Sequence, residues 1–193
     1  LEFRRVLFRS EDCYETFKEL FDPIISDRHN GYAPDAKQPT NLNIEEILDT
    51  DIDPYDKYVL TTRVRTGRSV RGFKLPPVIE FEERRKLEAV AVKGLLNMEG
   101  DLKGDYFPLH GSRSYAPKPN GMSEAKEGEL RKMGNLFQEP DSTLLLASGM
   151  ARHWPDGRGV FHNDAKNLFV WINEEDHLRV VSMQGSRDKC TPE

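Results

Sequence analysis

Two arginines in the segment YVLTTRVRTGRS, residues 58–69, have the residue type and spacing for binding an anion. Side chains of a strand alternate between its faces, so Arg63 and Arg65 share one face with Thr61. Their guanidinium groups, about 6–7 Å apart along the strand, repel each other unless an anion lies between them. A phosphate chain meets that requirement. The alternative is an exposed strand face whose arginines pair with nearby acids, and the spacing alone does not decide.

A second candidate is the acidic turn NEEDHLR, residues 173–179. Glu174, Glu175 and Asp176 place three carboxylates in one turn, with Arg179 close behind. Adjacent carboxylates raise one another's pKa unless a cation lies between them. A bound guanidinium, a metal ion with its waters or an arginine could be that cation. On spacing alone, however, an ordinary charged hairpin turn is the favoured interpretation.

The histidines and the known catalytic motifs give weaker signals. His162 stands alone near the end of a predicted strand, where a packed or capping role is more common than catalysis. A zinc site built from His153, His162 and His177 would have spacings that match no zinc pattern. The sequence lacks a P-loop, a GxGxxG after a strand and a GxSxG elbow. These absences exclude several nucleotide-binding and hydrolase classes.

The composition indicates a polar globular chain. It has 193 residues, 37% of them hydrophobic and 32% charged, which suits one domain, or one domain and part of another. A net charge of −5 argues against general nucleic-acid binding, and no apolar run is long enough to predict a membrane helix. Cys13 and Cys190 form neither a disulfide framework nor a CxxC site, which favours a reducing, cytoplasmic compartment.

The chain divides into four segments. Residues 1–10 (LEFRRVLFRS) are arginine-rich without a clear period, and we interpret them as non-native adaptor sequence. Residues 11–56 combine a helical pattern at 11–22 with a Pro- and Gly-containing irregular stretch, which predicts the end of a helical domain and a linker. Residues 57–184 form the main domain, and residues 185–193 an aberrant tail.

The main domain is predicted to be α+β, with an antiparallel sheet flanked by helices. The turn-rich segments NDAKN and NEEDH separate the last three predicted strands, and such short connections imply antiparallel neighbours. The strand LFVWI is apolar on both faces and should lie centrally under a cover of helices. The pattern predicts strands at 58–65, 102–109, 159–162, 168–172 and 178–183, helices at 80–97 and 122–137, and a segment of undetermined type at 142–147.

Four segments together match one family: YVLTTRVRTGRS, LKGDYFPL, LLLASGMARHWPDGRGVFHND and LFVWINEEDHLRVVSM. They resemble the ATP:guanido phosphotransferases, or phosphagen kinases. FDPIISDRHNGY also fits, so the resemblance covers about residues 11–184. Within the family, LLLASGMARHWPD is more similar to the members that use creatine than to those that use arginine. The resemblance implies a truncated catalytic domain of the glutamine-synthetase and guanido-kinase type at 57–184, after the end of a small helical domain.

The resemblance also implies an activity and its nucleotide-binding residues. The activity is reversible transfer of the γ-phosphoryl group of ATP to a guanidino nitrogen, with ATP or ADP and Mg²⁺ as cofactors. The nucleotide-phosphate motif corresponds to residues 61–65, His162 matches a histidine that contacts the nucleotide, and Arg179 matches a phosphate-binding arginine. The motif residues are Thr61, Thr62, Arg63, Val64 and Arg65.

The same resemblance assigns the acceptor side of the reaction to the acidic turn. Glu175 matches the carboxylate that holds the guanidinium and acts as general base. Glu174 and Asp176 fall in the same motif, where they imply no direct metal ligand but an interaction with magnesium-bound water. Creatine is the favoured acceptor, and taurocyamine, glycocyamine and arginine remain alternatives.

The family pattern continues beyond this chain, so we expect a fragment that binds nucleotide weakly and has no useful kinase activity. The alternative is a truncated, non-catalytic nucleotide-binding module. The resemblance favours a homodimeric parent protein in the cytoplasm, with mitochondrial or flagellar forms as alternatives, and no nucleic-acid or membrane partner. Residues 111–120 (GSRSYAPKPN) look like an insertion relative to the creatine-using members, and their role stays open.

Overall fold

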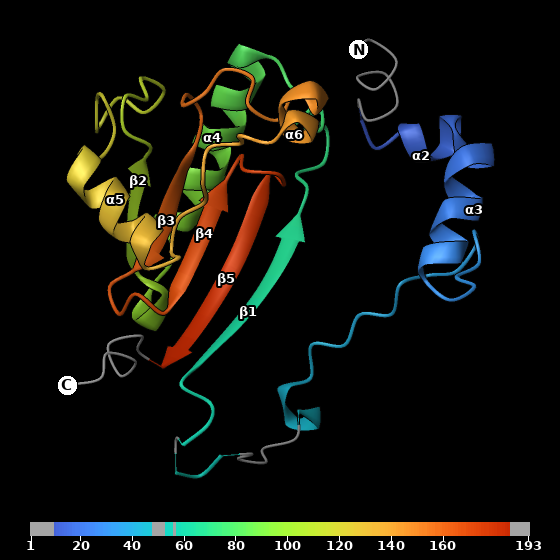
Figure 1. Cartoon of the computed structure of the whole chain (residues 1–193), viewed down its shortest axis with the longest axis horizontal. Helices are drawn as coiled ribbons and strands as arrows, with labels where there is room; N and C mark the ends of the chain where they lie inside the picture. The colour runs from blue at the N-terminus through green and yellow to red at the C-terminus, as the bar shows by residue number, and fades with distance from the viewer. Residues whose placement is uncertain (1–9, 48–52, 56, 186–193) are drawn as a thin grey trace.

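Five strands form one antiparallel sheet in the order β1-β5-β4-β3-β2 (Figure 1). The structure is a computed structural model that describes residues 10–47, 53–55 and 57–185. All four strand pairs are antiparallel, which confirms the predicted α+β fold. The strands are β1 (Thr61–Arg68), β2 (Gly104–Pro108), β3 (Gly159–Asn163), β4 (Leu168–Ile172) and β5 (Leu178–Gly185).

Strand β4 lies at the centre of the sheet, as its apolar sequence predicts. It has the predicted bounds, Leu168–Ile172, and four of its five residues are buried. Its neighbours are β3 and β5, and the turn between β4 and β5 is the acidic segment. The sheet register therefore fixes where the acidic turn lies relative to every other strand.

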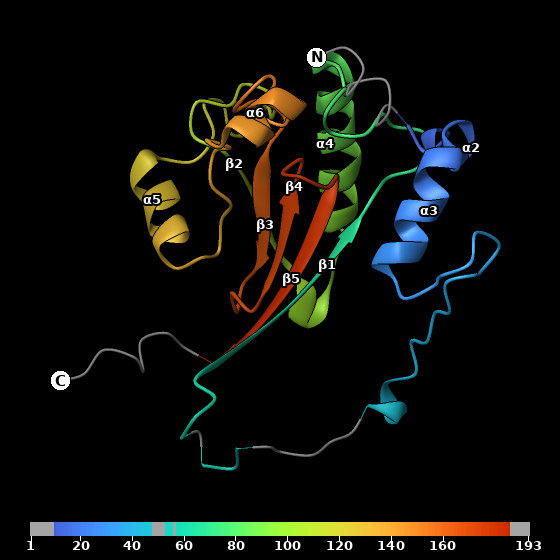
Figure 2. The ribbon, with the colours of Figure 1, turned by 45° about the vertical axis from the view of Figure 1, so that its right-hand side comes forward.

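Helices cover both faces of this sheet (Figure 2). Helix α4 (Phe81–Leu95) packs on one face, and α5 (Glu124–Lys132) and α6 (Thr143–Ser148) lie on the other. The core on the α5 side is made of Leu109, Met122, Leu130, Leu136, Phe137, Val160, Phe169, Trp171 and Val181. The core on the α4 side is made of Ile79, Leu87, Val92, Leu95, Tyr106, Phe161, Val170 and Ile172.

The buried side of α4 combines apolar and charged residues. Leu87, Arg84 and Glu88 are buried, whereas Val90 is 56% exposed. Glu88 accepts a hydrogen bond from the Tyr106 hydroxyl at 2.6 Å, so a polar contact lies within this interface. Burial raises the pKa of Glu88. A pattern of apolar residues alone could not identify this polar seam.

Helix α5 is shorter than the predicted helix at 122–137. Ser123 caps its start, because the Ser123 hydroxyl accepts a hydrogen bond from the Lys126 N–H. At its end, Gly134 has φ +73°, and the Asn135 N–H bonds the Leu130 carbonyl at 2.8 Å. This left-handed glycine turn terminates the helix and returns the chain to the sheet.

The N-terminal helices are α2 (Cys13–Thr16) and α3 (Lys18–Arg28). The prediction ended helical structure at Pro23, but α3 continues through it. Pro23 lacks an N–H, yet Phe21 and Ile25 on either side pack with Cys13, and this packing outweighs the lost hydrogen bond. The irregular stretch after α3 contains one 3-10 turn, Ile44–Glu46.

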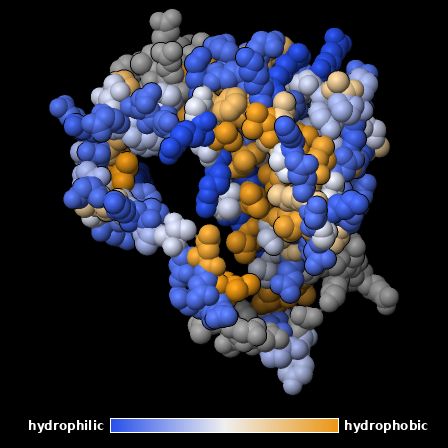
Figure 3. All heavy atoms as spheres, turned by 180° about the vertical axis from the view of Figure 1, so that it is seen from behind, coloured by the Kyte–Doolittle hydropathy of each residue, from blue (hydrophilic) through white to orange (hydrophobic). Residues whose placement is uncertain are grey.

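Strand β1 begins three residues later than predicted and forms one edge of the described sheet. All eight of its residues are exposed, and among the described strands it pairs only with β5. On the face opposite the arginines, Val64 is 65% exposed, and hydrophobic residues form a band in the view from behind (Figure 3). The edge strand that carries the predicted anion site is thus open to solvent.

Two predictions concern segments outside the described residues. The segment interpreted as adaptor, residues 1–10, lies outside the described residues except for Ser10, and the tail at 185–193 is described only at Gly185.

A further 3-10 turn, Gly100–Leu102, leads into β2. No helix in the described part of the chain combines the length and apolar character that a membrane crossing requires.

Candidate functional site

The two arginines of β1 lie on one face of the sheet, as the strand alternation predicts. Arg63 pairs with Met183 of β5, and Arg65 pairs with Val181. Met183 and Val181 belong to the core on the α5 side, so both arginines project from that face. Thr61 has the same orientation.

The other two residues of the nucleotide-phosphate motif, Thr62 and Val64, alternate with the arginines. Val64 pairs with Ser182 and Thr62 with Gln184. Their side chains therefore project from the opposite face of β1. Thr62 and Val64 can contribute to a site beside Arg63 only through their backbone. Of the five motif residues, only those on the face of Arg63 can contribute side chains to that site.

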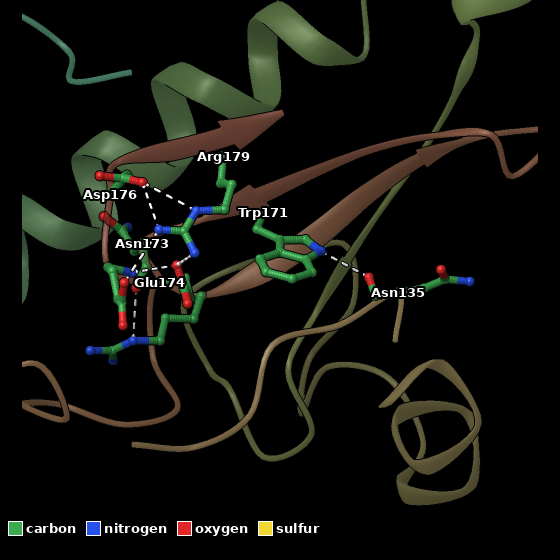
Figure 4. Close-up of polar contacts among 8 residues, drawn as sticks. Asn135, Trp171, Asn173, Glu174, Asp176 and Arg179 are labelled. Atoms are coloured by element: carbon green, nitrogen blue, oxygen red, sulfur yellow. Dashed lines mark hydrogen bonds and ion pairs between the residues drawn. The ribbon is translucent and has the colours of Figure 1, made fainter. Parts of the chain in front are cut away.

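Arg179 lies at the centre of the acidic turn and contacts all three carboxylates. Figure 4 shows it between Glu174 and Asp176. Its Nη1 is 3.0 Å from Glu174 Oε2. Its Nη2 is 2.9 Å from Asp176 Oδ2 and 3.3 Å from Glu175 Oε2. The cation that three adjacent carboxylates require is thus an arginine of the same hairpin, one of the alternatives left open by the sequence.

The three carboxylates differ in their surroundings. The Glu174 side chain is 16% exposed, against 45% for Glu175 and 39% for Asp176. Burial raises the pKa of Glu174, and the charges of Glu175 and Asp176 raise it further, while Arg179 opposes them. Glu175 is the carboxylate with the most open approach from solvent.

Sheet and helix together form an open groove of about 450 Å³ beside this turn. Both β1 arginines, Arg179 and two of the turn carboxylates line it, so the groove joins the two predicted motifs. The remaining wall comes from the last turn of α5 and the segment after it. The lining residues are Arg63, Arg65, Arg131, Gly134, Leu136, Phe137, Gln138, Trp171, Glu174, Glu175 and Arg179.

Trp171 connects the floor of the groove to its wall. Its indole N–H donates to the Asn135 carbonyl at 2.8 Å, which ties the segment after α5 to β4 (Figure 4). Its ring packs against Phe137 at 5.6 Å between centroids, and the Arg63 guanidinium lies 5.3 Å from the ring centroid. The sequence favours a core role for Trp171. The residue is 5% exposed and does lie in the core, and its ring also borders the groove.

His177 connects the acidic turn to the segment that follows β1. Its ring is completely buried. Nδ1 accepts a hydrogen bond from the Val70 N–H at 3.0 Å, so the neutral ring carries its proton on Nε2, which donates to the Lys74 carbonyl at 2.9 Å. Burial lowers the pKa of His177, which keeps the ring neutral.

Gly67 permits the close approach of β1 to the same turn. It pairs with Arg179, and a Cβ added to Gly67 would lie 2.6 Å from Asp176 Oδ2. A larger residue would therefore displace the carboxylate that binds Arg179. His177 and Gly67 both serve the contact between the arginine strand and the acidic turn, and the residue types alone gave no sign of either pairing.

His162 lies apart from this groove. It borders a second cavity of about 320 Å³ under α5, together with Lys126 and Lys166. Its ring stacks on Phe107 at 4.8 Å, and Nδ1 is 3.0 Å from the Asn163 carbonyl oxygen. Burial lowers its pKa. The structure does not bring His162 together with Arg63 and Arg179.

The hypothetical zinc site finds no support in the arrangement of the three histidines. His153 packs against Phe81, His162 lies on β3, and His177 bonds the backbone of Val70 and Lys74. Within residues 10–47, 53–55 and 57–185, no group of three or more His, Cys, Asp or Glu side chains is arranged to hold a metal ion.

Two buried arginines, Arg84 and Arg158, lie behind the acidic turn, and the sequence analysis missed both. Arg158 is 0% exposed, and its Nε donates to the Asn173 carbonyl at 3.0 Å. Asn173 has φ +57°, and its side-chain amide donates to the Gly157 carbonyl at 2.6 Å. These bonds fix the residue that directly precedes Glu174. An arginine beside glycine in PDGRG resembles an ordinary loop, so no sequence signal distinguished it.

Comparisons with known proteins extend the geometric findings. The family model of the ATP:guanido phosphotransferase C-terminal catalytic domain matches residues 86–189. The chain is 51% identical over 175 residues to creatine kinase M-type of Tetronarce californica and of Homo sapiens, and 52% identical to the creatine kinase testis isozyme of Oncorhynchus mykiss. In each case the match covers 90% of this chain and 43% of the relative. The chain therefore spans less than half the length of these curated relatives.

Solved structures agree with this match. A crystal structure of lombricine kinase has a TM-score of 0.79 and 41% sequence identity, covering 94% of this chain and 47% of that one. The duplicated taurocyamine kinase from Schistosoma mansoni, with bound transition state analog components, has a TM-score of 0.77 and 38% identity, covering 91% of this chain and 24% of that one. The resemblance seen in the sequence is confirmed: the chain belongs to the ATP:guanido phosphotransferase family.

Proposed function

We propose that the protein containing this chain catalyses reversible transfer of the γ-phosphoryl group of ATP to a guanidino substrate. The observation that carries this proposal is the groove in which Arg63 and Arg65 face the Arg179–carboxylate cluster. It combines cations for a phosphate chain with carboxylates for a guanidinium. Phosphoryl transfer relies mainly on such positioning and on charge stabilisation.

In this proposal the arginines bind the phosphate chain. Arg63 and Arg65 project from one face of an exposed strand, and Arg179 lies on the same face of the adjacent strand β5 and lines the same groove. Planar guanidinium groups bind phosphate oxygens bidentately and fix their positions as well as their charge. Three of them around one groove would hold the γ-phosphorus in line with an attacking nitrogen and stabilise charge on its oxygens.

Glu175 is the proposed acceptor-binding residue and general base. One of its oxygens already lies 3.3 Å from the Arg179 guanidinium, which indicates that a planar cation fits against it. The guanidino nitrogen forms a bond to the γ-phosphorus while the bond from that phosphorus to the bridging oxygen of ADP breaks. Glu175 accepts the proton that the nitrogen loses.

Magnesium enters this proposal as part of the substrate, bound to the phosphates of ATP. Glu174 and Asp176 each contact Arg179 at 3.0 Å or less. Neither carboxylate is therefore proposed as a direct ligand of the metal ion. An interaction of either residue with magnesium-bound water would use the oxygens that Arg179 leaves available. The ion would neutralise charge on the phosphate chain.

Creatine is the proposed acceptor. The support is the 51% identity to creatine kinases, against 41% to a lombricine kinase and 38% to a taurocyamine kinase. Residues 57–184 are proposed to be part of the catalytic domain and residues 11–56 the end of a helical domain and its linker. A homodimeric parent protein and a cytoplasmic location stay predictions from the sequence.

A non-catalytic nucleotide-binding module is the second candidate for the chain taken by itself. Every residue of β1 is exposed, so water reaches the arginines freely. Solvent screens their charge and competes for the transferred phosphoryl group. Residues 1–193 on their own are therefore expected to bind ADP weakly and to show no measurable turnover.

The test compares the natural protein that contains these residues with a Glu175→Gln variant. Phosphoryl transfer from MgATP is measured with creatine, taurocyamine, glycocyamine, lombricine and arginine. We expect creatine to give the largest kcat/KM, and Glu175→Gln to lower kcat by about 10²-fold or more with little change in ADP affinity. Glu99→Gln, the same change at an exposed site, is the control. Full activity of Glu175→Gln, or none with any acceptor, would overturn the assignment.

A further inference from the structure

Arg131 lines the same groove as the arginines of β1, although neither the resemblance nor the spacing singled it out. It lies in the last turn of α5, on the helical wall opposite the sheet. We infer that Arg131 is a further phosphate-binding residue, which contacts the phosphate chain of the nucleotide from the helix side. The inference rests on the proposed function, because it assigns a further residue to the same nucleotide site.

The position of the Arg131 guanidinium is fixed by contacts on two sides. Its Nη2 lies 2.9 Å from Glu127 Oε1, one helical turn earlier, and its Nε donates to the Phe137 carbonyl at 3.3 Å. The side chain is 26% exposed. Both contacts hold the guanidinium at the groove before any ligand arrives, which lowers the entropy lost on binding.

The carbonyl that holds Arg131 is itself fixed by the fold. The left-handed turn at Gly134 ends α5 and reverses the chain, so that Phe137 packs on Trp171. The Asn135 carbonyl accepts the indole N–H of Trp171, as described above. Arg131 is thus attached to the floor of the groove through a short chain of contacts.

The charges of the groove favour an anionic ligand between its walls. Four arginines line it, against two glutamates, and both glutamates contact Arg179. An ordinary surface pair with Glu127 is the alternative interpretation of Arg131. Such a pair does not require the bond to the Phe137 carbonyl, which helps to hold the guanidinium in the lining of the groove. A phosphate chain between the helix and β1 would reach it there.

The experiment measures the binding of ADP and of inorganic pyrophosphate to residues 1–193, titrated to millimolar concentration and followed by calorimetry. Arg131→Gln is expected to weaken both ligands about tenfold, the usual effect of losing one charge-assisted hydrogen bond. Lys132→Gln is the matched control: it makes the same charge change on an adjacent, exposed residue that does not line the groove. It should change affinity less than about twofold.

Two further variants separate the explanations. Glu127→Gln removes the ion pair but keeps Arg131 and its bond to the Phe137 carbonyl, so it should weaken both ligands clearly less than Arg131→Gln does. If it weakens binding as much as Arg131→Gln, the effect is structural and the inference is wrong. Loss of ADP binding with unchanged pyrophosphate binding would also overturn it, because Arg131 would then contact the nucleoside. Arg65→Gln tests the proposed function. If Arg65→Gln weakens binding and Arg131→Gln leaves it unchanged, only the inference about Arg131 is wrong. If neither variant changes binding, both the inference and the proposed function are wrong.

Discussion

Two arginines of β1 line the groove and two others lie buried behind the acidic turn, and the two pairs have different surroundings. Arg63 and Arg65 lie on a strand whose residues are all exposed. Arg84 and Arg158 are 1% and 0% exposed, yet no described acid forms a salt bridge with either. Burial lowers the pKa of Arg158 to about 10 and that of Arg84 to about 9, where the charges of Arg158 and Arg152 contribute as well.

The difference lies in what satisfies the guanidinium N–H groups. Arg158 donates to the backbone carbonyls of Asn173, Asp156, Met150 and Arg152. The protein itself therefore uses the hydrogen-bonding capacity of that residue, and its role is structural. The β1 arginines line an open groove, where an anionic ligand can reach them. Exposure and acceptor type, rather than residue type, separate a structural arginine from a binding one.

The largest expected effect is at Arg158. Replacing it by methionine leaves one buried and three part-buried carbonyl groups without this donor, so we expect the free energy of unfolding to fall by about 4 kcal/mol, or the chain not to fold. Urea unfolding followed by circular dichroism gives this value. A loss below about 1 kcal/mol would mean that Arg158 is not the structural member of the comparison.

Arg65→Gln should have the opposite profile. The side chain is exposed, so the free energy of unfolding should change by less than about 0.5 kcal/mol. ADP affinity should fall about tenfold, because one charge-assisted contact to phosphate is lost. Calorimetry and urea unfolding on the same sample separate the two quantities. If Arg65→Gln lowers the free energy of unfolding as much as the free energy of ADP binding, the β1 arginines do not differ in role from the buried pair.

His177 should make stability depend on pH. Its pKa is lowered in the folded state, chiefly by burial, so the unfolded chain binds the proton more readily. Its stabilising contribution is complete above the unfolded pKa of about 6.5 and is lost as the pH falls. His177→Gln keeps one acceptor and one donor but does not titrate.

Unfolding free energies at pH 7 and pH 5 provide the measurement for His177. The unmodified chain should lose more stability on acidification than His177→Gln, with a difference of at most about 1.4 kcal/mol per pH unit, the limit for one proton. The exposed His29→Gln is the control and should behave like the unmodified chain. If the unfolding free energies of His177→Gln and of the unmodified chain depend on pH in the same way, the buried neutral ring of His177 does not stabilise the contact between the acidic turn and residues 70–74.

The smallest effect is expected for Arg84→Met, the same substitution as at Arg158. Arg84 donates to the Pro76 carbonyl at 3.2 Å, but its buried Nε and Nη1 have no hydrogen-bond partner among the described residues. Methionine removes these two unpaired donors along with one hydrogen bond, so stability should change by less than about 1 kcal/mol. A loss as large as that at Arg158 would show that burial of the charge, rather than its partners, decides the outcome.

The sequence predicted the sheet well where strands are short, apolar and locally connected. Strand β4 has its predicted bounds, and β3 and β5 begin at the predicted residues. Strand β1 was predicted three residues too early, because YVL has strand-forming residues, whereas the true bounds depend on pairing with the distant β5. Local patterns contain no information about such a partner.

The candidate site was predictable in its motifs but incomplete in its geometry. Arg63, Arg65, Arg179 and Glu175 were identified, and the structure brings them to one groove. Arg131 was missed because a helical arginine four residues after a glutamate is typical of a solvated pair. His162 borders another cavity, and its assignment to the nucleotide-binding residues stays a prediction. Both facts depend on how α5 packs, which the sequence does not state.

Among the described strands, β1 is attached to the sheet only through β5, and this arrangement has a consequence for biosynthesis. Thr61 pairs with Gly185, so the arginine strand leaves the ribosome long before the strand that orders it. Until then it lies at the start of a long open loop, whose closure costs entropy and slows folding. The nascent protein can therefore acquire its anion-binding groove only once β5 has been made, after the central strands β3 and β4.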